Sequence, residues 1–308
     1  MSTIKTIYAR EILDSRGNPT LETSIFTDDG KGAISSIPSG ASTGKYEAKE
    51  LRDEDKTRYD GLGVLKACAN VNQIISKALI GLDPLKQNDI DQTLINLDGT
   101  ANKAKLGANA ILSVSQACFE LGASCAGLQT FQYASQKYAL AKPQVNRLPT
   151  PIFNLINGGM HGGGNIQFQE FHCIPSSRKL FSESLEMVSE LYHLLKRILI
   201  EKKAIHSVGD EGGFAPNLFS NTDAIELLIE TIEASKFRLN EDIYIGLDIA
   251  ASSLFSGGKI SISDNKDSMN SEEFVTFLAD LFHKYNLLSI EDPFDQDNWR
   301  AGLTFMPW

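Results

Sequence analysis

Three acidic segments end or follow apolar, strand-like runs. IYIGLDIA carries Asp248, LLSIEDPF carries Glu291 and Asp292, and HSVGDEGGFAP carries Asp210 and Glu211. In a barrel of parallel strands, polar residues at the carboxyl ends of the strands line the mouth of the active site. Asp and Glu oxygens that converge there, with no cysteine nearby, suit a hard cation such as Mg²⁺. The alternative is that each acid only caps the helix or turn that follows it.

A glycine-rich segment, NGGMHGGGNIQFQE at residues 157–170, carries three more polar side chains that could contact a ligand: His161, Gln169 and Glu170. Glycines permit positive φ angles and let a ligand approach the backbone closely. The QEF run then fixes Gln169 and Glu170 at the edge of a strand. We interpret the segment as a binding loop, with an exposed and inert His161 as the alternative.

A second glycine-rich segment, PSGASTGKYE at residues 38–47, includes Ser39. It is not a P-loop, because Tyr46 stands where the motif G-x-x-x-x-G-K-[ST] requires Ser or Thr. The segment is either a mobile lid or an ordinary long turn.

The elements that must position these side chains fall into two regions. Residues 4–8 and 20–27 are β-branched or alternating and flank a Gly-Asn-Pro turn, which predicts two strands. From about residue 60 to 135 apolar residues recur every three to four positions, which predicts helices. Strands followed by helices indicate a small, three-stranded α+β domain over residues 1–140, before a proline-rich candidate linker at 141–151.

Residues 141–308 follow a different pattern, in which short apolar runs alternate with amphipathic helical stretches. This alternation predicts parallel strands, buried on both faces, with crossover helices. The last helix begins at a capping box formed by Asn270 and Glu273. The predicted strands are residues 152–156, 171–174, 243–249 and 287–290, and the predicted helices are about 182–202, 222–235 and 272–285.

Composition and charge restrict the class of protein. Twenty-nine Lys and Arg against 39 Asp and Glu give a formal net charge of −10. That charge repels polyanions, so we expect no nucleic-acid partner and no anionic membrane surface. The four cysteines form no C-x-x-C pair, the first residues show no secretory signal, and no apolar run approaches about 18 residues. We therefore expect reduced thiols, no membrane span and a cytoplasmic location.

Taken in order, the motifs of this chain resemble those of the enolase family. The resemblance runs from residue 1 to about 299 through AREILDSRGNPT, PSGASTG, LGANAILSVSQA, the NGG-x-H loop with QEF, VGDEGGFAP, GLDIA and SIEDPF. It implies an α/β fold, with an N-terminal α+β domain followed by an enolase-type α/β barrel. It also implies reversible dehydration of 2-phosphoglycerate to phosphoenolpyruvate, Mg²⁺ as cofactor, and a homo-oligomer in the full-length form.

The resemblance also implies roles for the acid side of the site. Glu211 matches the general acid that helps the C3 hydroxyl group leave. Glu170 matches the acid beside it that helps to position this leaving group. Gln169 and His161 match substrate-contacting positions.

Three further positions match metal-binding or substrate-binding residues of the family. Asp248 and Glu291 match two of the three carboxylates that hold the first magnesium, and Glu291 also faces the substrate. Ser39 matches the residue that closes over the substrate and joins the second magnesium. The chemistry explains these residue types, because divalent ions must neutralise the substrate carboxylate and the enolate-like charge before a base can remove the weakly acidic C2 proton.

The end of the chain departs from the family pattern. Pro151 to Trp308 spans about 160 residues, whereas an eight-stranded α/β barrel typically takes about 250. We expect a partial, open barrel that lacks the third metal carboxylate, the general-base lysine and the phosphate-binding segment, so that the chain alone is inactive. The alternatives are a non-catalytic interaction protein, for which the family offers cell-surface display as a precedent, and a related enzyme acting on a different carboxylate.

Overall fold

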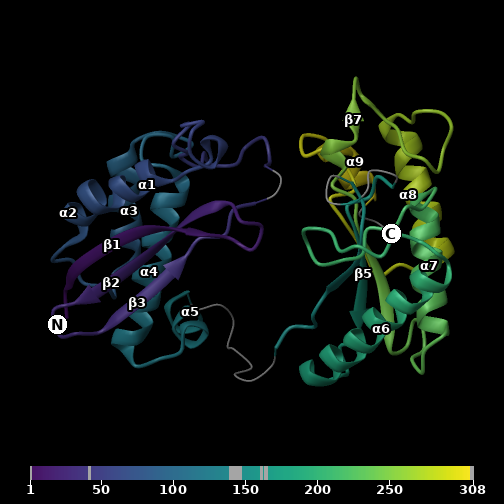
Figure 1. Ribbon diagram of the computed structural model, residues 1–308, viewed down its shortest axis with the longest axis horizontal. Coiled ribbons are helices and arrows are strands. Elements are labelled where there is room, and N and C mark those ends of the chain that lie inside the picture. Colours follow the sequence, from purple (N-terminus) through teal and green to yellow (C-terminus); the bar gives the residue numbers. More distant parts are fainter. Residues whose placement is uncertain (1, 41–42, 139–147, 160–161, 163–165, 306–308) are drawn as a thin grey trace. The chain divides into compact units, whose positions relative to one another are not determined.

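The computed structural model describes residues 2–40, 43–138, 148–159, 162 and 166–305. The chain divides into two compact units, Met1–Asn146 and Arg147–Trp308 (Figure 1). Both units combine helices with a β-sheet, so the predicted mixed α/β class is confirmed.

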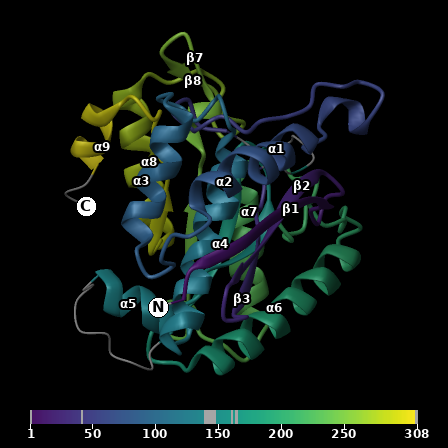
Figure 2. The ribbon, with the colours of Figure 1, turned by 90° about the vertical axis from the view of Figure 1, so that its left-hand side faces the viewer.

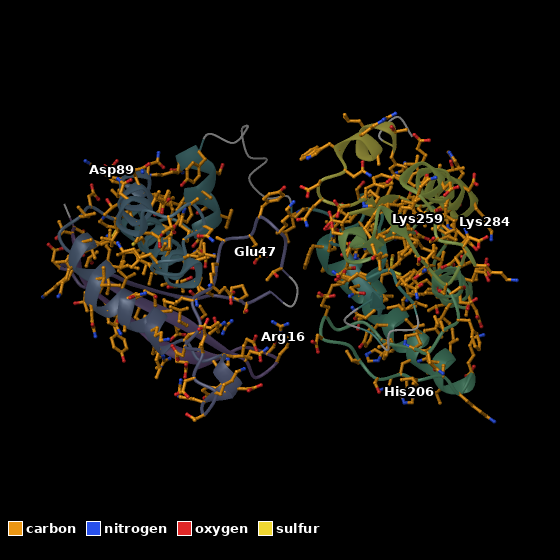
Figure 3. The ribbon with its side chains drawn as sticks, turned by 90° about the horizontal axis from the view of Figure 1, so that it is seen from above. Arg16, Glu47, Asp89, His206, Lys259 and Lys284 are labelled. Atoms are coloured by element: carbon orange, nitrogen blue, oxygen red, sulfur yellow. The ribbon has the colours of Figure 1, made fainter. Side chains whose placement is uncertain are left out.

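The first unit contains a three-stranded antiparallel sheet, as predicted. Its strands are β1 (Ile4–Leu13), β2 (Pro19–Thr27) and β3 (Gly32–Ser36), paired in that order. Arg16 lies in the turn between β1 and β2 (Figure 3). Asp14 Oδ1 closes this turn by accepting hydrogen bonds from the backbone N–H groups of Arg16 and Asn18, both at 2.8 Å.

Helices cover one face of this sheet and complete the core of the first unit (Figure 2). The long helix α4 contacts β2 and β3 and buries an apolar stripe against them. The helical elements of this unit are η1 (Tyr59–Gly61), α1 (Leu65–Asn70), the π-helical turn η2 (Val71–Ile75), α2 (Ser76–Leu79), α3 (Gln87–Asp98), α4 (Ala108–Ala126) and α5 (Thr130–Tyr138).

The second unit is built on a four-stranded sheet, in the order β4-β5-β6-β9. Its strands and helices fall close to the predicted ranges. The strands are β4 (Phe153–Asn157), β5 (Glu170–Pro175), β6 (Ile243–Asp248) and β9 (Ser289–Glu291); a small hairpin comprises β7 (Phe255–Ser256) and β8 (Lys259–Ile260); the helical elements are α6 (Phe181–Glu201), α7 (Asn221–Glu233), η4 (Ala251–Ser253), α8 (Ser271–Tyr285) and α9 (Trp299–Phe305). Within the part of the chain that the structure describes, this sheet is open, as expected.

The prediction that all strands of this unit run parallel is wrong. Only β6 and β9 are parallel, whereas β5 is antiparallel to both β4 and β6. The cause lies in the connections. No helix is described between β4 and β5, so the chain returns in the opposite direction, and the two helices α6 and α7 between β5 and β6 reverse it again.

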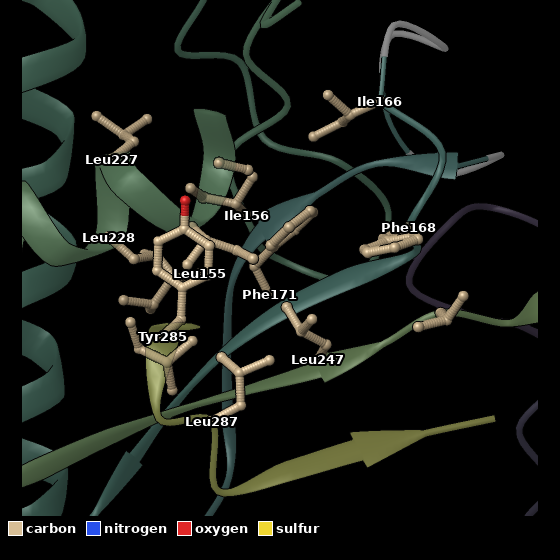
Figure 4. Packing of buried hydrophobic residues seen from close by; sticks show 14 of the residues in the cluster. Leu155, Ile156, Ile166, Phe168, Phe171, Leu227, Leu228, Leu247, Tyr285 and Leu287 are labelled. Carbon is tan, nitrogen blue, oxygen red and sulfur yellow. The ribbon is translucent and has the colours of Figure 1, made fainter. Parts of the chain in front are cut away.

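Apolar side chains from the sheet and from α6, α7 and α8 form one buried cluster in the second unit. Phe171 and Leu247 belong to this cluster, as do Leu228 and Tyr285 from the helices (Figure 4). The predicted capping box at the start of α8 is confirmed: Asn270 accepts from the backbone of Glu273 at 3.0 Å, and Glu273 accepts from the backbone of Asn270 at 2.8 Å.

Helix length and apolarity decide whether any of the described helices could cross a bilayer. No single one among them is long and apolar enough to cross a membrane; α4 and α5 pass that test only as a pair bent by 93°.

Candidate active site

Four polar residues form one row across the sheet of the second unit. In register, Asn157 on β4 pairs with Glu170 on β5, Glu170 with Asp248 on β6, and Asp248 with Glu291 on β9. Directly paired residues project from the same face of a sheet, and neighbouring strands lie about 4.8 Å apart. Three carboxylates are therefore held side by side by backbone hydrogen bonds; below, these four residues are called the polar row.

The antiparallel direction of β5 places Glu170 in the polar row. Asn157, Asp248 and Glu291 are the last residues of their strands, whereas Glu170 is the first residue of β5. Because β5 begins at the edge of the sheet where β4, β6 and β9 end, its first side chain lies beside their last side chains.

Glu211 reaches the polar row from a turn. The predicted strand-like run before Asp210 and Glu211 is wrong: residues 205–211 form no strand, and Val208 makes only an isolated bridge to Phe214. Phe214 fastens the turn to β4, because its carbonyl accepts from the backbone of Asn157 at 2.8 Å and its own N–H donates to Leu155 at 2.9 Å. Asp210 is exposed.

Two neighbours hold the Glu211 carboxyl group. Asn157 is buried and donates from Nδ2 to Glu211 Oε2 at 3.2 Å. Glu211 also shares a hydrogen bond with Glu170. Desolvation, followed by this bond and by the charges of Glu170 and Asp248, raises the pKa of Glu211 to about 7, against the lowering effect of Asn157. Glu211 is thus substantially protonated near neutral pH, as a general acid must be.

Asp248 is the most enclosed of the carboxylates in the polar row, with 9% of its surface exposed. Burial and the charges of Glu291, Glu170 and Asp292 together raise its pKa to about 6, against a lowering hydrogen bond from the Ala250 backbone. Gln169, just before β5, donates from Nε2 to Asp248 Oδ2 at 3.2 Å. The neighbouring acids thus concentrate negative charge around Asp248.

Sequence reasoning missed two residues at this site, Asn157 and His172. His172 is buried on β5 and its Nε2 lies 2.7 Å from Glu170 Oε2. The two-residue period of a strand puts His172 on the same face as Glu170, a signal that was present in the sequence. The mostly apolar FHCIP run around it is otherwise typical of a buried core strand. Asn157 could be found only from the pairing of β4 with its neighbours.

The two remaining predicted site residues are Ser39 and His161. Ser39 belongs to the first unit, where its hydroxyl group donates to Glu50 at 3.2 Å and accepts from Arg52 at 2.9 Å. Its carbonyl oxygen accepts from Arg16 at 2.7 Å. His161 lies outside the described residues.

Comparison with known protein families assigns both units of the chain. The enolase N-terminal domain matches residues 4–134, and the enolase C-terminal TIM barrel domain matches residues 145–306. The chain belongs to the enolase family. The carboxylates of the polar row thus lie in the barrel part of an enolase-family chain, and the PSGASTG segment with Ser39 lies in its N-terminal domain.

The carboxylates of the polar row offer the oxygen ligands that a hard divalent cation prefers. Among the described residues, no group of three or more His, Cys, Asp or Glu side chains is arranged to hold a metal ion. Asp248 and Glu291 are nevertheless register partners, and the charge on Glu291 raises the pKa of Asp248. Mg²⁺ is commonly bound by one or two carboxylates together with water and substrate oxygens. The donor set of these two residues therefore fits such an ion.

Proposed function

We propose that this chain carries the acid and metal-binding side of an enolase site, which reversibly dehydrates 2-phosphoglycerate to phosphoenolpyruvate. The observation that carries the proposal is the Glu211 carboxyl group, whose pKa is raised to about 7 and which is hydrogen-bonded to Glu170 beside the carboxylates of β6 and β9. A protonated acid next to a concentration of carboxylates suits the departure of a hydroxyl group as water, and the carboxylates would supply ligands for a divalent ion.

Glu211 serves as the general acid in this proposal. Its proton is given to the C3 hydroxyl group as the bond from C3 to that oxygen breaks, so that water leaves. Glu170 accepts a hydrogen bond from the C3 hydroxyl group and so holds the departing oxygen in place. Asn157, through its bond to Glu211 Oε2 at 3.2 Å, keeps the acid turned toward the polar row.

Asp248 and Glu291 would hold Mg²⁺, and Gln169 orients Asp248 through its bond to Oδ2. Bound there, the ion supplies positive charge that stabilises the carboxylate and enolate-like charge of the substrate. We further propose that His161 contacts the substrate and that Ser39 closes over it, as the family motifs imply.

The base is the part of the reaction for which the 308 residues offer no matching motif. We therefore propose that the purified chain, on its own, binds Mg²⁺ weakly and turns over far more slowly than a full-length family member. Loss of a general base alone typically costs 10²- to 10⁴-fold in rate.

The test uses the 308-residue chain, purified from a host whose own enolase is removed and checked by intact mass. Calorimetry with Mg²⁺ and 2-phosphoglycerate measures binding, and absorbance of phosphoenolpyruvate measures turnover. We expect weak, Mg²⁺-dependent binding of 2-phosphoglycerate that is lost in Asp248→Ala and retained in Asp280→Ala, a matched change at an exposed acid on α8.

Two results would contradict this proposal in different ways. If 2-phosphoglycerate showed no Mg²⁺-dependent binding, the metal-binding role proposed for the polar row would be refuted. Turnover within about tenfold of a full-length member would show that a base is present after all.

A further inference from the structure

A second tier of residues lies one step below the polar row on the same face of the sheet. In register, Asn154 on β4 pairs with His172 on β5, His172 with Gly246 on β6, and Gly246 with Ser289 on β9. His172 is the large polar residue of this tier, with 4% of its surface exposed. It is the member of the tier that contacts an acid of the polar row.

We propose that His172 is a positioning residue, which holds the Glu170 carboxylate in place and, through it, the Glu211 carboxyl group. This inference rests on the proposed function and extends it to a residue that the family motifs do not assign. The contact that carries it is the 2.7 Å bond between His172 Nε2 and Glu170 Oε2.

The donors and acceptors around Glu170 support this role. Two carboxyl groups share a hydrogen bond only when one of them keeps its proton, because an ionised carboxylate is an acceptor alone. In this proposal His172 carries a proton on Nε2 and donates it to Glu170 Oε2, 2.7 Å away, so that Glu170 is the acceptor toward both neighbours. The proton that the pair shares then belongs to Glu211, the residue that must deliver it to the leaving group.

The opposite end of this chain of contacts is also fixed. Asn157 donates to Glu211 at 3.2 Å, and Gly213 approaches so closely that a Cβ there would lie 2.6 Å from Asn157 Oδ1. The two acids are therefore held between a buried asparagine and a buried histidine. Rigid support of this kind keeps a catalytic pair within the narrow range of geometry that proton transfer needs.

A simpler reading is that His172 only fills space beneath the polar row. The two readings differ in their effect on Glu211, which His172 reaches through Glu170. Residues that belong to one hydrogen-bond network show non-additive effects on stability, whereas independent residues are additive.

The first experiment needs no ligand. Urea unfolding of the full chain in EDTA is measured for wild type, His172→Met, Glu211→Gln and the double variant, with His206→Gln as a control at an exposed histidine. We expect at least threefold non-additivity in the unfolding equilibrium constant for His172 with Glu211. We expect additive effects for His206 with Glu211. The His172→Gln variant keeps an N–H donor, so its unfolding equilibrium constant should stay close to that of wild type.

The second experiment compares two ligands that differ at one group. Binding of 2-phosphoglycerate and of 2-phospholactate, which lacks the C3 hydroxyl group, is measured with Mg²⁺ for the same variants. His172→Met should weaken 2-phosphoglycerate at least fivefold and leave 2-phospholactate within twofold, and His172→Gln should restore the preference.

The outcomes separate this inference from the proposed function. Additive unfolding effects, or an equal loss for both ligands, would overturn the role of His172. Coupled unfolding in a chain that binds neither ligand would leave the positioning by His172 standing and would refute the proposed function instead.

Discussion

Replacing Asp248 by Asn should stabilise the metal-free chain at pH 7.5 while removing its response to Mg²⁺. Asp248 is 9% exposed, and its pKa in the folded chain is about 6, against an ordinary value of 3.8. A raised pKa means that the stability contributed by the protonated form is fully present below pH 3.8. It is lost as the pH rises through about 6. At pH 7.5 the ionised side chain therefore weakens the fold.

The size of this effect follows from the shift. Each pKa unit corresponds to about 1.4 kcal/mol, so a shift of about two units sets an upper limit of about 3 kcal/mol. Asn cannot ionise, but its amide would face the Gln169 donor that now bonds to Asp248 Oδ2, and turning that amide costs about 1 kcal/mol. We expect a net gain of about 1–2 kcal/mol at pH 7.5, or a rise of about 2–6 °C in Tm.

Urea and thermal unfolding at pH 4 and pH 7.5, in EDTA and in 10 mM Mg²⁺, measure this directly. Both tryptophans of the chain, Trp299 and Trp308, fall in the second unit, so their fluorescence reports on it. In EDTA the advantage of Asp248→Asn should disappear at pH 4. In Mg²⁺ at pH 7.5 wild type should gain about 1.4 kcal/mol for a Kd of about 1 mM, and the variant nothing. A variant less stable than wild type in EDTA at pH 7.5 would refute the reasoning.

Three further predictions concern positions outside the carboxylates. Gly213→Ala should lower the free energy of unfolding by about 1–3 kcal/mol, because its Cβ would lie 2.6 Å from Asn157 Oδ1. Gly302→Ala in α9, whose Cβ would have nothing within 4 Å, should instead raise it by about 0.5–1 kcal/mol. Urea midpoints that move in the same direction for both variants would contradict this. Asn270→Ala should lower the free energy of unfolding by about 1 kcal/mol through loss of the α8 cap, and an unchanged midpoint would show the cap to be unimportant. Ellman's reagent at pH 8 should modify only Cys125 in the folded chain, since the other three thiols are buried; rapid reaction of more than one thiol would contradict that burial.

Local patterns predicted the elements of the second unit well. The apolar runs that contain β6 and β9 end at Asp248 and Glu291, and the structure makes these two residues partners in register. The Asn270 capping box likewise depends only on residues three apart, so it could be recognised from the chain alone.

Strand direction and cross-strand partners could not be predicted in the same way. A two-residue alternation looks the same when a strand is reversed, so nothing within EFHCIP indicates that β5 runs against its neighbours. The partly apolar HSV run before Glu211 predicts a strand end, whereas the hydrogen bonds that fix this turn come from Leu155 and Asn157 on β4. Such partners become visible only when distant segments are brought together.

The hairpin made by β4 and β5 also sets an order of folding. Only residues 158–169 separate β4 from β5, whereas residues 176–242 separate β5 from β6. Closing the shorter loop costs less chain entropy, and contacts between near neighbours in sequence form faster. We therefore expect Asn157 and Glu170 to pair early, and Asp248 on β6 to join them later. In pulsed amide exchange during refolding, protection should reach the β4–β5 hairpin before it reaches β6.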